Sequence, residues 1–258
     1  MPPPKFDTFS DEHLVTISLT LAVPILLSLL ARVTSARSAT RCIASALASV
    51  LLANKGIHWG YRLSEIGGLR FAQNHLPAHV CGIAVLATAA TLLFRNQRSY
   101  EIAYFWGLVG SANAVITPGG IDAVFPEYRF FQYFISHSGI VVGTLFATWA
   151  MRMRPTIGGL LRAFIWLNVL AVVAALLNVI LNSNYMYLCA PPSNTVSPFF
   201  FLPWPWYIPW LELVALCLFV LVYLPFLAID RRSRHRLVDR YRESNVRSFR
   251  RERSGPGS

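Results

Sequence analysis

Charged residues are scarce in this 258-residue chain: Asp, Glu, Lys and Arg together make up 14% of it, while 55% is hydrophobic. A soluble globular domain usually carries about 25% charged residues. Acidic residues are the scarcer kind, with 12 Asp and Glu against 23 Lys and Arg. These shortages argue against an ordinary soluble protein and indicate a membrane chain, in which basic residues mark the loops that face the cytoplasm.

Paired cysteines are also missing. The four cysteines lie far apart and no two of them form a CxxC motif: Cys42, Cys81, Cys189 and Cys217. This spacing excludes a zinc ribbon and a thioredoxin-like redox motif. A cleavable signal peptide is not expected either, because the first apolar run follows an acidic lead rather than a basic one.

Seven apolar runs are each close to the ~20 residues that a membrane-spanning helix needs. They cover residues 14–31, 42–60, 79–94, 100–117, 132–151, 159–182 and 206–229. The sequence therefore predicts an all-α fold, a polytopic integral membrane bundle of seven transmembrane helices over residues 1–229. The runs do not divide into obvious repeats, which disfavours a secondary transporter.

Basic residues set the expected orientation. Most of them follow the first, third and fifth runs or fill segment 230–258, which holds ten arginines between Arg231 and Arg253. The positive-inside rule then predicts the N-terminus outside and the C-terminus inside, in a bacterial inner membrane. We expect the basic tail to be disordered and to attract anionic lipid head groups. A nucleic-acid partner is not expected, because the arginines flank a span and no binding fold accompanies them.

Polar residues collect in the outer half of the expected bundle. They come from separate parts of the chain: Lys55, His58, His79, Cys81, His137 and Glu212. Ionisable groups inside a membrane are costly, so they usually face a cavity or a partner. Lys55 and Glu212 are candidates to pair with each other, and the alternative is that both extend to the outer interface.

A cysteine and a histidine form the predicted catalytic pair. His79 and Cys81 are two residues apart, and residues at i and i+2 of a helix point to different sides. A pair must then come from two helices, and Cys81 with His137 is the economical choice, because imidazole favours the reactive thiolate. The alternative is that Cys81 is an inert buried thiol and His137 a packing residue.

Two further interpretations stay open. Four histidines could converge on zinc or copper: His58, His75, His79 and His137. Only His75 and His79 have i, i+4 spacing, and Pro77 interrupts it. The other interpretation is a non-catalytic binder or transporter, in which the same outer cavity holds a small molecule or a lipid.

Several sequence blocks resemble a known family: LPAHVC, FWGLVGSANAVITP, YRFFQYFISH and NSNYMYL…PPSN…PWPWY. They are similar to the YwaF-like bacterial membrane proteins, which are grouped with the eukaryotic transmembrane-protein-164 family, over about residues 40–225. The resemblance implies an acyltransferase, since the characterised animal member moves fatty acyl chains onto lysophospholipids through an acyl-thioester, with a cysteine and a histidine. More distant androgen-induced membrane hydrolases use a threonine and a histidine.

The resemblance carries over residue by residue. His137 matches the family histidine and takes the role of base, whereas the family cysteine falls at Ala78, one helical turn before Cys81. It implies a lipid-modifying acyltransferase or transacylase that uses Cys81 and His137, needs no cofactor or metal, and has membrane lipids as partners, including an acyl-donor phospholipid. The expected substrate-binding residues face the outer leaflet: His79, Asn113, Asn184, Tyr185, Tyr187, Lys55 and Glu212.

Overall fold

The computed structural model of the chain describes residues 6–34, 36–119, 123–192 and 199–229. These ranges are largely helical and contain no strand. The helices in chain order are α1 (Asp11–Val33), α2 (Arg37–Asn74), α3 (Val80–Phe94), the continuous segment α4 (Gln97–Ile102), η1 (Ala103–Ser111) and α5 (Ala112–Ile116), α6 (Tyr128–Trp149), α7 (Ile157–Leu181), the short η2 (Tyr185–Tyr187) and a last helix, Tyr207–Ile229. Each of the seven predicted runs lies largely within one helical segment, so the all-α class is confirmed.

In the part of the chain that the structure describes, four helices are long and apolar enough to cross a membrane, judged by length and composition: α1, α6, α7 and the last helix. Helix α3 is apolar too, but it has only 15 residues. Helices α1 and α7 leave many of their large apolar side chains exposed, as surfaces that meet lipid do. The described part of the chain thus has the character of a helical membrane protein.

Helix α2 extends well beyond its predicted run. The sequence predicts a span over 42–60, whereas α2 continues for 38 residues to Asn74. Hydropathy misses the extension because charged and polar residues interrupt the apolar ones after position 60, although the segment is still helical. Gly67 interrupts it with a φ of 74°, a left-handed conformation that glycine adopts without steric cost.

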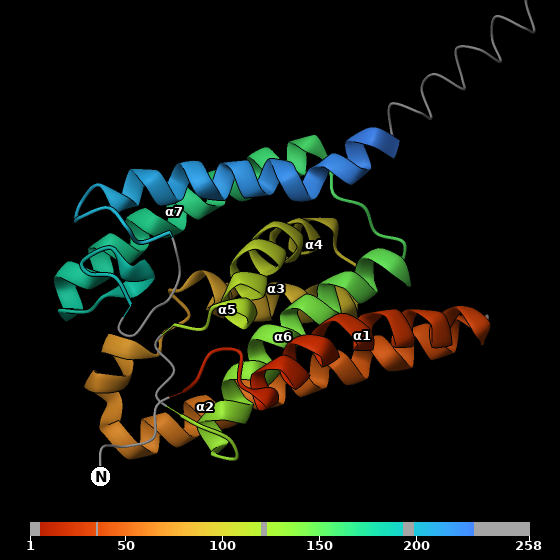
Figure 1. The fold of residues 1–258 in the computed structure, drawn as a ribbon, viewed down its shortest axis with the longest axis horizontal. Coiled ribbons are helices and arrows are strands. Elements are labelled where there is room, and N and C mark those ends of the chain that lie inside the picture. The colour runs from red at the N-terminus through yellow and green to blue at the C-terminus, as the bar shows by residue number, and fades with distance from the viewer. Residues whose placement is uncertain (1–5, 35, 120–122, 193–198, 230–258) are drawn as a thin grey trace, which may run out of the picture. The chain divides into compact units, whose positions relative to one another are not determined.

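Close contacts surround α3 and α6. Helix α3 packs against α2, α6 and η1, while α6 also packs against α1, which runs beside it in Figure 1. Glycines permit this proximity: a Cβ on Gly107 would lie 2.7 Å from Ile140, and one on Gly143 would lie 2.7 Å from Thr88. Small residues at helix crossings let backbones approach closely in membrane bundles. The fourth predicted run, diluted by glycine, is therefore an interior helix.

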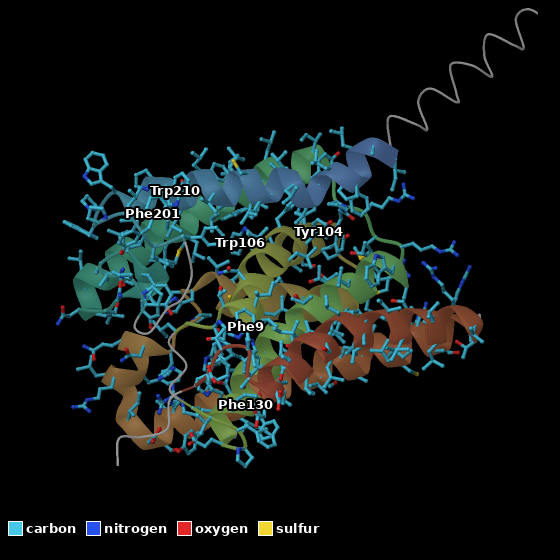
Figure 2. All side chains as sticks on the ribbon, in the orientation of Figure 1. Phe9, Tyr104, Trp106, Phe130, Phe201 and Trp210 are labelled. Carbon is cyan, nitrogen blue, oxygen red and sulfur yellow. The ribbon has the colours of Figure 1, made fainter. Side chains whose placement is uncertain are left out.

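Segment η1 is a π-helix of nine residues, longer than the single-turn π-bulges that are common in α-helices. Two side chains in its first half bond to other helices. The Trp106 indole N–H donates to the Ala163 carbonyl of α7 at 3.0 Å, and Figure 2 shows Trp106 in the interior of the fold. The Tyr104 hydroxyl donates to the Val222 carbonyl of the last helix at 2.8 Å.

Helix α1 is held by buried polar contacts. The His13 ring is fully buried, accepts from the Phe9 N–H at 2.9 Å on Nδ1, and therefore donates through Nε2 to the Val115 carbonyl at 2.7 Å. About two turns further along the helix, the Thr20 hydroxyl donates to the Ser138 hydroxyl of α6 at 2.7 Å. These bonds tie α1 to α5 and α6.

A buried carboxylate joins α4 to α7. Glu101, 2% exposed, accepts from Thr156 at 2.8 Å, from Gln97 at 3.1 Å and from the Arg162 guanidinium at 2.6 Å. A buried charge is tolerable when it is paired and its remaining lone pairs are satisfied, as here. Gly159 lies against this carboxylate and leaves no space for a side chain.

Among the described residues, those up to Val222 belong to one compact unit and residues 223–229 to a second. The predicted basic tail, 230–258, lies outside the described residues.

Gly159→Ala should destabilise the protein, because the new Cβ would overlap the Glu101 carboxyl group. Overpacking of this kind costs about 1–3 kcal/mol. Gly158→Ala is the matched control, since its Cβ would meet only the flexible end of Arg162, at 3.3 Å. Thermal unfolding in detergent should show a lower midpoint for Gly159→Ala and an unchanged or slightly higher one for Gly158→Ala. Equal midpoints for the two variants would contradict the packing.

Candidate functional site

A cavity of about 520 Å³ brings together residues that are far apart in the sequence. Its volume is typical of small-molecule and cofactor sites. The predicted site residues that line it are Lys55 of α2, His79 before α3, Cys81 of α3, Asn113 of α5, His137 of α6, Tyr187 of η2 and Glu212 of the last helix. Most of the remaining lining is apolar, so the cavity presents a few polar groups on a hydrophobic wall.

Cys81 lies in the first turn of α3. His79 is the N-cap residue in an extended conformation and its side chain makes no capping hydrogen bond, so the first amides of α3 keep free N–H groups. The Ser111 hydroxyl donates to the Cys81 Sγ at 3.8 Å, and Lys55 lines the same cavity. The positive end of a helix favours a thiolate at this position.

His137 has one nitrogen occupied and one available. Its Nδ1 lies 2.8 Å from the Tyr133 carbonyl oxygen, which can only accept, so Nδ1 carries the proton. In the neutral ring Nε2 is then an unprotonated acceptor, the form that a general base requires. The Tyr133 ring packs against the imidazole, with centroids 4.2 Å apart, and its hydroxyl donates to the Ala114 carbonyl at 3.0 Å.

His79 has the opposite tautomer. Its Nδ1 accepts from the Met186 N–H at 3.3 Å, so the proton of the neutral ring is on Nε2. The ring packs between Tyr185 and Tyr187, with centroid distances of 5.1 and 5.4 Å. The cavity wall therefore offers a hydrogen-bond donor at His79 and an acceptor at His137.

The predicted pairs do not contact each other directly. Among the residues that the structure describes, no hydrogen bond joins Cys81 to His137 and no ion pair joins Lys55 to Glu212. Lys55 instead places its ammonium 5.0 Å from the Trp59 ring centroid, a cation–π contact. The Glu212 carboxylate accepts from Asn168 at 3.2 Å. Lys55 and Glu212 thus both line the cavity, but each contacts a neighbour other than the predicted partner.

Asn184 and Tyr185, both predicted to bind substrate, do not line the cavity. Asn184 accepts from the Cys189 and Ala190 amides at 3.0 and 3.2 Å and so closes its own loop. The Tyr185 side chain is buried, and its hydroxyl donates to the Ala72 carbonyl at 2.6 Å. Both residues hold the loop that presents Tyr187 to the cavity.

Asn178 is a positioning residue that sequence reasoning missed. Its amide accepts from the Tyr185 N–H at 2.6 Å and donates to the Tyr185 carbonyl at 3.1 Å, which fixes the loop to the end of α7. Tyr133 was missed as well, although its position four residues before His137 could have suggested a shared helix face.

The four histidines considered for a metal site do not form a cluster of metal ligands. Within the described ranges no group of three His, Cys, Asp or Glu is placed to hold a metal ion. His58 and His75 are neighbours, with ring centroids 5.3 Å apart, but the Arg62 Nε donates to the His75 Nε2 at 3.2 Å. A guanidinium cation therefore occupies the position at which a metal would bind the Nε2 of His75.

Comparison with known proteins gives a family and one distant relative. The sequence profile of the TMEM164 family matches residues 8–223. An uncharacterized protein of Treponema pallidum (strain Nichols) is 29% identical over 158 residues, which is 60% of this chain and 63% of that protein. The chain thus spans less than two thirds of the relative's length. No solved structure matches.

The His75 ring should titrate at an unusually low pH. Burial, followed by the nearby Arg62 guanidinium, lowers the pKa of His75 from 6.5 to about 4. Because a proton on Nε2 would oppose the Arg62 contact, the neutral ring and the contact should persist until the pH falls to that value. NMR titration of histidine-labelled protein measures this midpoint, and His75→Gln assigns the signal.

Arg62→Gln should move that midpoint toward 6.5, while Arg98→Gln, which changes an exposed arginine in the first turn of α4, should leave it unchanged. A wild-type midpoint near 6.5 would be inconsistent with the burial and the contact.

Proposed function

The chain belongs to the TMEM164 family, and on that premise we propose that it is an integral membrane enzyme that transfers fatty acyl chains between lipids. Cys81 is the proposed nucleophile and His137 the proposed base. The supporting observation is a largely apolar cavity whose wall holds a thiol at a helix N-terminus and an imidazole with a free Nε2. A thiol and a base facing one space are what thioester chemistry requires.

The first half-reaction loads the acyl group. The His137 Nε2 accepts the thiol proton, and the Cys81 thiolate attacks the ester carbonyl of a donor phospholipid. When the tetrahedral intermediate collapses, the carbon–oxygen bond breaks and the lysolipid oxygen takes the proton from His137. The products are an acyl-thioester on Cys81 and a lysophospholipid.

The second half-reaction reverses these roles. A hydroxyl of the acceptor lysolipid gives its proton to the His137 Nε2 and attacks the thioester carbonyl. The carbon–sulfur bond breaks, and the thiolate recovers the proton from His137. Cys81 and His137 make no hydrogen bond in the substrate-free structure, and catalytic hydrogen bonds are often long until substrate binds.

The negative charge on the tetrahedral intermediate needs hydrogen-bond donors, and the cavity wall offers two kinds of candidate for the oxyanion. The free amides in the first turn of α3 adjoin the thiol, and the His79 Nε2–H is a second candidate donor to the oxyanion. Lys55 is suited to the phosphate of a head group, because its ammonium lacks a carboxylate partner in the described ranges. Asn113 accepts from Thr117 through Oδ1 at 3.1 Å, which leaves its NH₂ group to donate.

The orientation follows from the charge pattern. We place the N-terminus outside, the C-terminus inside and the cavity toward the outer leaflet of a bacterial inner membrane. Arg37, Arg41, Arg95 and Arg152 line a separate cavity that includes the opposite end of α3, which supports this orientation under the positive-inside rule.

A non-catalytic lipid or small-molecule binder is the second candidate. It is favoured by the absence of a hydrogen bond between Cys81 and His137 among the described contacts. The two candidates differ in one respect: an enzyme forms a covalent intermediate, and a binder does not.

Protein reconstituted with phosphatidylcholine should carry an acyl adduct on Cys81 that hydroxylamine removes. Intact-mass spectrometry detects the adduct and peptide mapping locates it. Cys81→Ala should lose it entirely, whereas Cys42→Ala and Cys217→Ala, which remove exposed thiols, should keep it. Finding no adduct on the wild-type protein, with lipid nevertheless bound, would leave the binder.

His137→Gln should slow formation of the adduct by about 10²–10⁴-fold, the usual contribution of a general base. The matched control is His58→Gln, because His58 is a buried histidine that does not line the cavity. Initial rates of thioester formation measure the effect. If both variants acylate at the wild-type rate, His137 is a packing residue.

A further inference from the structure

A second cavity, of about 730 Å³, includes the end of α3 opposite to Cys81. Four arginines line it: Arg37 and Arg41 from α2, Arg95 after α3, and Arg152 after α6. We propose that this cavity binds the phosphate group of an anionic ligand. The proposal does not depend on the function proposed for the first cavity.

The charge of the second cavity is all of one sign. No aspartate or glutamate is among the residues that line it. The Arg95 guanidinium donates to the Met151 carbonyl at 2.8 Å, while Arg37, Arg41 and Arg152 make no side-chain hydrogen bond or ion pair with other described residues. Several guanidinium groups around one hollow repel each other, and a bound anion relieves that repulsion.

The backbone of α2 adds to this positive potential. One face of the first turns of α2 lies along the cavity, through Arg37, Thr40, Arg41 and Ser45. The N-cap residue Ala36 provides no side-chain cap, and the first turn of α2 contains no acidic residue. The free amides and the positive helix end favour a phosphate there.

The positive-inside rule alone does not account for this arrangement. That rule places basic residues near a membrane surface but does not direct them into one cavity. All of these arginines are exposed, and Arg98 and Arg154 lie close in sequence to the four lining ones, yet they do not line the cavity. Only some of the arginines in this region therefore line the cavity, and the others can serve as control positions for mutation.

The chemistry of the lining specifies the ligand class. Guanidinium groups recognise phosphate through paired N–H donors, and the Thr40 and Ser45 hydroxyls can add hydrogen bonds. Leu93 and Phe94 line the same cavity and are exposed, Phe94 by 76%. A phosphate with an apolar body fits this wall, and the phosphate can belong to a lipid head group or to a free phosphate ester.

The test is native mass spectrometry of the full chain in detergent, with phosphatidic acid, glycerol 3-phosphate and phosphatidylcholine as probes. We expect the wild-type protein to bind one or both phosphate monoesters more tightly than the zwitterionic lipid. Preference for phosphatidic acid identifies a lipid head group, whereas equal binding of glycerol 3-phosphate identifies a free phosphate ester. Either result supports the site, and no preference over phosphatidylcholine overturns it.

Arg37→Gln/Arg41→Gln should weaken phosphate binding by about tenfold for each arginine removed, as loss of a charged hydrogen bond does. Arg98→Gln/Arg154→Gln makes the same change of charge outside the cavity and should bind as the wild type does. Arg152→Gln, from a different element, guards against a failure of the α2 variants to fold and should weaken binding by a similar factor. Equal weakening by the control pair would show general charge attraction and overturn the proposal.

Discussion

The arrangement of this protein depends on the burial of one short apolar helix. Helix α3 packs among α2, α6 and η1, and its alanines and threonines, together with the facing Gly143, allow that close packing. Both cavities include residues from α3, one from its first turn at Cys81 and the other from its last turn at Phe94. These residues are separated by roughly 20 Å at the 1.5 Å rise of an α-helix. Because α3 is packed on several sides, it holds the residues at its two ends in fixed positions in two chemically different cavities.

The two cavities differ in how their polar groups are arranged. In the first, each ring or charge is oriented by a contact behind it: His137 by Tyr133, His79 by Met186 and Glu212 by Asn168. Such contacts hold a reactive atom toward the cavity without closing it, which suits positioned chemistry. In the second cavity, most of the guanidinium groups lack a partner in the described ranges, which suits the binding of an anionic ligand.

Much of the fold could be predicted from hydropathy, because a helix that crosses a membrane needs about 20 mainly apolar residues. The extension of α2 to Asn74 could not be predicted in this way, since charged and polar residues interrupt the apolar ones after position 60. At the site, Cys81, His79 and His137 were recognisable as unusual residues, and the structure places them on one cavity wall. The roles of Tyr185 and Asn178 were not recognisable, because their hydrogen bonds join segments whose proximity depends on the loop after α7.

By itself, the sequence determined the helical class, the places of the apolar segments and the excess of basic residues, all of which follow from local composition. Only the tertiary structure decided which nitrogen of His137 carries a proton, that Lys55 faces Trp59 rather than Glu212, and that four separate arginines share one cavity. The reason is physical: the Tyr133 and Trp59 contacts each lie within one helix, but which rotamer a side chain takes, and which residues of different helices line one cavity, are set by tertiary packing.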